Sequence, residues 1–172
     1  GNPYQNDVSY RGFQATSALG APTGLSVYFD GVRMNEPFGA NMNWDLVPMN
    51  AISSINMIPG SNPLFGSNTL GGALAINTKN GKDDPGTGIT VLGGSFNRRA
   101  FQIETGWSDS VHNTDYFIAG NYDKQDGYRW YSNSTVQQLF GKARWHDAST
   151  NAELSFSFAD NSLSGCLLYT SP

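Results

Sequence analysis

Residues 64–79 of the chain are Leu64-Phe65-Gly66-Ser67-Asn68-Thr69-Leu70-Gly71-Gly72-Ala73-Leu74-Ala75-Ile76-Asn77-Thr78-Lys79. The apolar run from Ala73 to Ile76 has the length of a strand, and the glycines before it fall where a backbone turn or a close approach is needed. A phosphate-binding loop is excluded, because no Gly-Lys-Ser/Thr follows these glycines and no long helix begins there. The stretch therefore predicts a tight turn that leads into a strand.

Towards the N-terminus, two more apolar runs have strand length, Leu25 to Phe29 and Ile52 to Ile58. Residues typical of turns follow each run, as Asp30-Gly31 follows the first. Pro48 suits the start of a helix, so Asn50 to Ser54 is expected to form one helical turn before a strand. The first half of the chain therefore predicts a small mixed domain.

Towards the C-terminus, the polar and breaker-rich segment Asn80-Gly81-Lys82-Asp83-Asp84-Pro85-Gly86 marks the expected domain boundary. Beyond it, apolar and polar residues alternate with a period of two, as Phe101, Ile103 and Trp107 do with Gln102 and Glu104, which predicts strands with one apolar face. The expected strand lengths match the ~9–11 residues that cross a bilayer at a tilt. The five strands are expected at about residues 87–94, 98–108, 114–124, 135–146 and 151–160.

The connections between these strands alternate in length, with a longer one at residues 123–134 between shorter ones at 109–113 and 147–150. Aromatic residues gather at both ends of the strands, as they do at the two interfaces of an outer-membrane barrel. A soluble β-sandwich has equally good alternation, so this half of the chain leaves barrel and sandwich open. The aromatic residues are Trp107, Tyr116 and Trp145 beside the short turns and Tyr122, Tyr128, Trp130 and Tyr131 at the long connection.

The composition argues against several classes of protein. The chain has 172 residues, a net charge of −4 and no cluster of Lys and Arg, which argues against a nucleic-acid partner. A single cysteine, Cys166, excludes a disulfide framework and a thiolate metal site. No apolar run reaches the ~18 residues of a membrane-spanning helix. The first residues lack the features of a signal peptide, so a truncated or matured N-terminus is expected.

Four blocks together resemble, in order and spacing, the plug of TonB-dependent receptors: Tyr10-Arg11-Gly12-Phe13, Val27 to Val32, Ala51 to Ile55, and residues 64–79. The resemblance covers about residues 8–79, and the later strands fall where the barrel of that family begins. It implies an α+β plug with a small mixed sheet, followed by the first ~5 antiparallel strands of a transmembrane β-barrel of the 22-stranded class. The expected divisions are a plug at 1–80, a linker at 81–86, the barrel start at 87–163 and a non-native tail at 164–172.

The resemblance implies an outer-membrane receptor for energised uptake of a scarce nutrient, such as a ferric siderophore or another metal complex. Its implied partners are a TonB-type inner-membrane energy complex, the small-molecule or metal-chelate substrate and outer-membrane lipid, with no nucleic acid. No enzyme activity, cofactor or resident metal is expected. The alternative is a soluble carbohydrate-binding or adhesive β-domain, whose aromatic residues would stack on sugar.

By position in the family's motifs, two plug loops would face the substrate, at residues 14–22 and 35–43. Their amides, hydroxyls, carboxylate and one aromatic ring offer hydrogen bonds and an apolar platform, although ordinary polar turns use the same residue types. Arg11 is expected to meet glutamates of the barrel wall, yet the arginine that the family usually carries near residues 58–63 is missing. The expected ligand-binding residues are Gln14, Thr16, Ser17, Asn35, Glu36, Phe38, Asn41 and Asn43.

Other polar residues suggest no second site. His112 and His146 have no partners at metal-ligand spacing and are expected to be surface residues. Asp83 and Asp84 lie in the boundary segment and are expected to be solvated. No Ser/His/Asp or nucleophile-elbow pattern is present. The sequence therefore predicts binding and transport rather than covalent chemistry.

Overall fold

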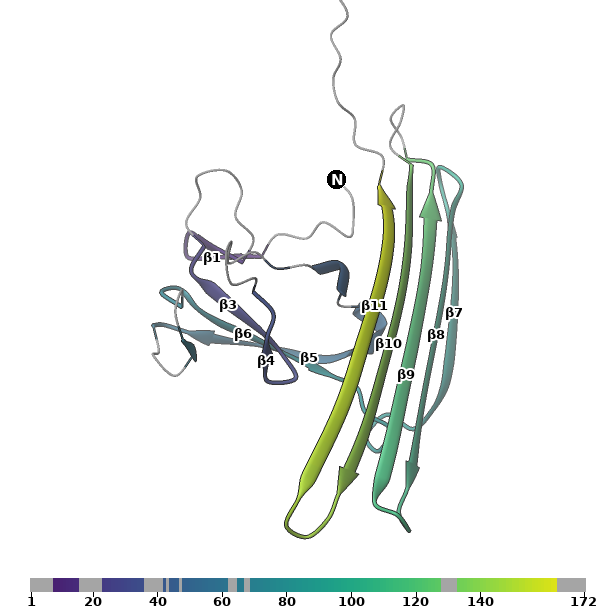
Figure 1. Cartoon of the computed structure of the whole chain (residues 1–172). Coiled ribbons are helices and arrows are strands. Elements are labelled where there is room, and N and C mark those ends of the chain that lie inside the picture. The colour runs from purple at the N-terminus through teal and green to yellow at the C-terminus, as the bar shows by residue number, and fades with distance from the viewer. Residues whose placement is uncertain are drawn as a thin grey trace, which may run out of the picture. The chain divides into compact units, whose positions relative to one another are not determined.

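The computed structural model describes residues 8–15, 23–35, 42, 44–46, 48–61, 65–66, 69–127 and 133–163. Its contacts divide the chain into two compact units, one of residues 1–47 and 52–79 and one of residues 48–51 and 80–172. Both are built mainly from strands, as Figure 1 shows. The short segment at 48–51 therefore groups with the strands of the second half, although its neighbours in the sequence belong to the first.

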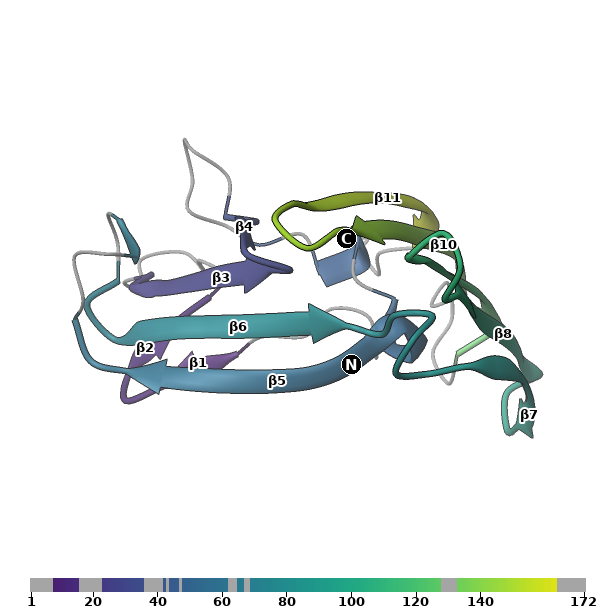
Figure 2. The same ribbon diagram turned by 90° about the horizontal axis from the view of Figure 1, so that it is seen from below.

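The first unit is a mixed sheet with the strand order β4-β3-β6-β5. Strand β3 (Leu25–Phe29) runs parallel to β6 (Gly72–Thr78), while β4 (Val32–Arg33) and β5 (Ile52–Pro59) pair antiparallel with these two. Figure 2 shows β3, β6 and β5 side by side. The small mixed sheet predicted from the sequence is confirmed, and the three apolar runs are its three longest strands.

The two central strands hold the core of this sheet. Leu25, Val27, Ala73 and Ile76 have at most 1% of their surface exposed. Strands buried on both faces are continuous in apolar residues, which is why these runs show no alternation. At the start of β6, Gly72 has a φ of 137°, and a Cβ there would lie 2.5 Å from a carbonyl oxygen of β5, so only glycine fits.

Short hairpins and turns complete the first unit. Strands β1 (Ser9–Tyr10) and β2 (Phe13–Gln14) pair across Arg11 and Gly12, whose φ angles of 51° and 83° are those of a tight two-residue hairpin turn. A 3-10 turn, η1, covers Trp44–Leu46. In the described part of the chain, no helix has the length and hydropathy needed to cross a membrane.

The second unit is an antiparallel sheet with the order β11-β10-β9-β8-β7, in which every strand pairs with its neighbour in sequence. The predicted strands are all present, and their bounds differ from the expected ones by at most three residues. Figure 2 views this sheet nearly along its strands and shows that it is curved. The strands are β7 (Gly86–Gly94), β8 (Arg98–Asp109), β9 (Thr114–Gln125), β10 (Ser134–His146) and β11 (Asn151–Leu163).

The second unit also includes a 3-10 turn, η2 (Met49–Ala51), which contacts β8 and β9. The helical turn expected at Asn50 to Ser54 lies instead at Met49–Ala51, and Ile52 to Ser54 are the first residues of β5. Pro48 precedes the turn and is fully buried. The element type was therefore predicted correctly, and its packing against the later strands was not foreseen.

Candidate functional site

The two faces of the five-stranded sheet differ in an unusual way: one face carries most of the exposed large apolar side chains, while the other carries buried ion pairs beside buried apolar residues such as Phe117 and Phe140. On β9, Ile118 and Tyr122 are 48% and 40% exposed, whereas Asp115 and Asp123, on the other face, are 1% and 3% exposed. The same division holds on β8 and β10, whereas β7 and β11 at the edges are exposed on both faces. The register aligns most of the exposed large side chains of the five strands on one face. These are Ile89, Val91, Phe101, Ile103, Trp107, Tyr116, Ile118, Tyr122, Leu139, Trp145, Leu154, Phe156 and Phe158.

Ion pairs and hydrogen bonds between side-chain amides pair several polar groups of the buried face. Arg144 Nε lies 3.0 Å from one carboxylate oxygen of Asp115 and 3.1 Å from the other, and the two residues are directly opposite on β10 and β9. Arg98 Nη2 lies 2.7 Å from Asp123. Between these pairs, Asn121 donates to Gln138 at 2.8 Å. Ionised groups on a buried face need such partners, because an unpaired one would lose its hydration without compensation.

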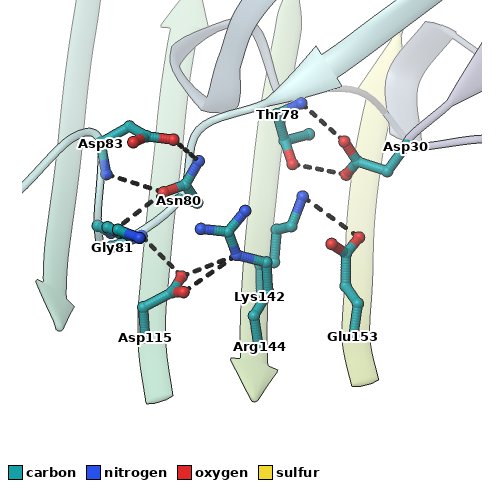
Figure 3. A network of polar contacts seen from close by, with 10 residues as sticks. Asp30, Thr78, Asn80, Gly81, Asp83, Asp115, Lys142, Arg144 and Glu153 are labelled. Atoms are coloured by element: carbon teal, nitrogen blue, oxygen red, sulfur yellow. Dashed lines mark hydrogen bonds and ion pairs between the residues drawn. The ribbon is translucent and has the colours of Figure 1, made fainter. Parts of the chain in front are cut away.

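Residues 80–84, here called the junction turn, lie on this buried face (Figure 3). The Asn80 carboxamide closes the turn, since its oxygen accepts from the main-chain nitrogens of Lys82 and Asp83 and its nitrogen donates to the Asp83 carboxylate. The Gly81 N–H donates to Asp115 at 3.2 Å. Asp83 is exposed, as expected for a solvated carboxylate, but Asn80 and Gly81 are buried.

Two glycines allow the junction turn to approach the sheet so closely. A Cβ on Gly81 would lie 2.2 Å from the carbonyl oxygen of Trp107 and 2.3 Å from that of Tyr116. A Cβ on Gly106 would lie 2.1 Å from the carbonyl oxygen of Asp84. Neither glycine has a positive φ, so the requirement is for space rather than for an unusual backbone.

A second short segment is held on the same two strands. Asn50 in η2 donates from Nδ2 to the carbonyl oxygens of Ile103 on β8 and Gly120 on β9, at 3.3 and 3.1 Å. Ile103 and Gly120 are opposite each other in the ladder, so one carboxamide bridges the two strands. Strands β8 and β9 thus bind two segments that lie far apart in the sequence.

Most of the predicted ligand-binding residues fall outside the described part of the chain, namely Thr16, Ser17, Glu36, Phe38, Asn41 and Asn43. Gln14 is described and is partly buried in β2. Asn35 is 8% exposed, and its side chain accepts from the Val27 N–H at 2.7 Å and donates to the Leu25 carbonyl at 3.2 Å. Its carboxamide therefore binds the main chain of β3.

Arg11 lies at the tip of the β1–β2 hairpin. Its side chain is exposed, with the guanidinium 5.2 Å from the centre of the Tyr10 ring. A tip position leaves the guanidinium accessible to a carboxylate of another part of the protein. The expected contact with a barrel glutamate remains a prediction.

The remaining candidates have structural explanations. His112 lies 2.6 Å from Asp109 within the turn after β8, and 74% of its side chain is exposed. His146 ends β10 and borders a polar hollow of about 430 Å³ together with Lys82, Arg144 and Glu153. No group of three or more metal-ligating side chains occurs among the described residues.

Sequence reasoning missed the residues that matter most on this face: Gly81, Gly106, Asp115 and Arg144. One signal was present, because Asp115 and Arg144 occupy the polar positions of two adjacent strands. Their pairing depends on the register of β9 with β10, which the hydrophobic pattern narrows but does not fix. The close approach of Gly81 leaves no local sequence pattern.

Comparisons with known proteins agree with this geometry. Residues 1–73 match the family model of the TonB-dependent Receptor Plug Domain. A curated relative, the rhizobactin receptor of Rhizobium meliloti (strain 1021), is 33% identical over 69 residues, which are 40% of this chain and 9% of that protein.

Two solved structures share the fold over nearly the whole chain. The pyoverdine outer membrane receptor FpvA from Pseudomonas aeruginosa PAO1 matches with a TM-score of 0.67 and 15% identity, over 95% of this chain and 24% of that one. The siderophore receptor PiuA from Acinetobacter baumannii matches with a TM-score of 0.67 and 20% identity, over 94% of this chain and 22% of that one. The chain therefore spans about a quarter of the length of these receptors or less.

Proposed function

We propose that this chain is part of a TonB-dependent receptor, with the plug domain and the first barrel strands, and that the whole protein lies in the outer membrane and imports a ferric siderophore. The relatives named above are receptors for rhizobactin, pyoverdine and other siderophores, which supports this class of substrate. Uptake requires binding and movement rather than covalent chemistry.

The observation that carries this proposal is the reversed polarity of the five-stranded sheet. In a soluble sandwich, the exposed face is polar and the buried face is apolar. Here the exposed face carries Ile103, Ile118 and Phe158, and the buried face carries the Asp115–Arg144 and Asp123–Arg98 pairs. This arrangement suits a wall with lipid outside and a polar lumen inside. It argues against the alternative of a soluble carbohydrate-binding domain.

In the proposed cycle, the siderophore binds from outside to the plug loops at 14–22 and 35–43 and to the barrel. An inner-membrane energy complex of the TonB type then performs the work that rearranges the plug. Binding alone cannot drive this step, because a ligand shifts a conformational equilibrium only by its differential affinity for the two states. Phe38 and the amides of Asn41 and Asn43 are among the proposed contacts.

The experiment is to express the complete gene in cells that lack their own siderophore receptors and to follow radiolabelled iron. A panel of ferric hydroxamate, catecholate and carboxylate siderophores, with cobalamin, would define the substrate. We expect one ferric siderophore to bind at the cell surface and to enter the cells. A protonophore should abolish entry while leaving surface binding intact.

Two controls distinguish background binding from specific binding, and binding from import. Cells with an empty vector measure background binding, and cells without the energy complex should bind the siderophore but not import it. Entry that persists without energy would contradict energised uptake. Binding of cobalamin, followed by its own radiolabel, in place of every ferric siderophore would contradict the substrate class.

A further inference from the structure

The chain that links the two units is held by a hydrogen bond to a carboxylate on each side of a short segment, Lys79 and Asn80. Before this segment, Asp30 accepts from the Thr78 N–H at 2.9 Å and from the Thr78 hydroxyl at 2.5 Å, which fixes the end of β6 within the first unit. After it, Asp115 accepts from the Gly81 N–H within the second unit. Figure 3 shows both carboxylates with their partners. The bonds to the two carboxylates are here called the pins.

Chain geometry shows what the second pin changes. A fully extended chain spans at most ~3.5 Å per residue, so the three steps from Thr78 to Gly81 allow about 10 Å. Without the bond to Asp115, the next residue that the sheet holds through strand pairing is Gly86, where β7 begins opposite Gly106. The eight steps from Thr78 to Gly86 allow about 28 Å. The pin therefore shortens the tether at the end of β6 almost threefold.

Arg144 stabilises the ionised, buried Asp115 carboxylate and fixes its orientation. Asp115 is 1% exposed, and a buried carboxylate needs compensation for its lost hydration. Arg144 contacts both carboxylate oxygens through Nε, which orients the group so that one oxygen also accepts from Gly81. The close packing of Gly81 and Gly106 holds the junction turn flat on the strands beneath it.

We propose that the junction turn is a resting-state clasp, in which Asp115, positioned by Arg144, keeps the covalent link between the plug and the barrel wall short and so limits how far the plug can move. This inference rests on the proposed function, because it needs a plug that closes a barrel. It adds named residues, Gly81, Gly106, Asp115 and Arg144, to a part of the chain that the sequence predicts to be a simple linker.

The test uses the purified complete receptor and two measurements: hydrogen exchange in peptides that cover residues 78–86, and ion conductance in planar lipid bilayers. Asp115→Ala removes the pin. Gly81→Ala lifts the turn by a clash with the carbonyl oxygens of Trp107 and Tyr116, without any change of charge. Both variants should exchange at least tenfold faster at residues 81–84 and should open conducting pores more often than the wild type.

Matched controls are available on the same sheet. Asp123→Ala removes an equally buried, arginine-paired aspartate of β9, eight positions from Asp115. Gly93→Ala adds a methyl group in a strand at a position where the new Cβ would meet no heavy atom within 4 Å. Both controls should leave exchange at 81–84 within about twofold of the wild type and should not raise conductance. Gly81→Ala keeps the test decisive if Asp115→Ala fails to assemble.

Each outcome bears on a different claim. Unchanged exchange in Gly81→Ala, or in an assembled Asp115→Ala, would overturn the clasp, and faster exchange without added conductance would overturn the limit that it places on plug movement. Siderophore binding by the wild type is measured separately. A receptor that binds no ferric siderophore but passes both clasp tests would refute the proposed substrate and leave the clasp standing.

Discussion

Asn35 shows that, from sequence alone, one polar residue can be explained either as a ligand contact or as a structural residue. Its place in a loop that the family resemblance turns towards the substrate suggested a ligand contact. In the structure its carboxamide binds the main chain of β3 through two hydrogen bonds, and only 8% of the residue is exposed. A buried amide with both ends engaged stabilises the fold, because leaving the main-chain groups unpaired would cost free energy.

We therefore predict that Asn35→Ala loosens the plug sheet before it affects binding directly. Loss of both bonds should lower the free energy of local opening at the Val27 amide by about 1–3 kcal/mol. Hydrogen exchange of the complete receptor measures this quantity. Asn133→Ala, at an exposed asparagine, should change it by less than about 0.5 kcal/mol. Weaker siderophore binding with unchanged protection at Val27 would instead favour a ligand contact.

The strands of the second half were predictable because alternation is a local signal. Each expected strand is present, and the largest difference is at the end of β11, which reaches Leu163 instead of residue 160. Gln102 and Glu104 lie on the face opposite Phe101, Ile103 and Trp107, as predicted. Strand β3 was predicted from a different signal, a short apolar run followed by turn residues, because it is buried on both faces and does not alternate.

Two short segments could not be predicted from local patterns. Residues 80–84 are rich in turn-forming and charged residues, which usually indicates a solvated linker. Their packing against β8 and β9 depends on the absence of a side chain at Gly106, more than twenty positions later, and on Asp115. Likewise, nothing near Asn50 predicts that its carboxamide bridges Ile103 and Gly120. Contacts of this kind are specified by the fold as a whole.

The apolar face of the sheet leads to a prediction for single strands. Ile118 lies near the middle of β9 and is 48% exposed on the face proposed to contact lipid. A lysine at the midplane of the lipid-facing side of a barrel costs about 2–4 kcal/mol. Ile118→Lys should therefore reduce the amount of folded receptor in the outer membrane, measured as the fraction that keeps its folded mobility on an unheated denaturing gel.

Val111→Lys is the matched change in the short turn after β8, where the side chain is 83% exposed. It should assemble like the wild type, because a lysine in an aqueous turn loses no hydration. Equal assembly of both variants would argue that the face of β9 that carries Ile118 is in contact with water.

At the scale of the whole molecule, the second unit combines an exposed apolar face with two open sheet edges. Strands β7 and β11 each pair on one side only among the described strands, so both edges present unpaired main-chain groups. The apolar face adds large exposed side chains on every strand between them. Water stabilises neither feature, because edge strands pair with other chains and apolar faces associate.

The 172-residue chain expressed alone should therefore aggregate in detergent-free buffer and disperse in detergent micelles, as measured by size-exclusion chromatography with light scattering. Residues 1–80, which omit the apolar face, should be markedly more soluble than residues 1–163. The comparison isolates the five-stranded sheet as the cause, because both chains contain the plug sequence. A monodisperse 1–163 chain that melts cooperatively without detergent would mean that the exposed apolar face is stable in water. That result would contradict both the contact of this face with lipid and the proposed place of the protein in the outer membrane.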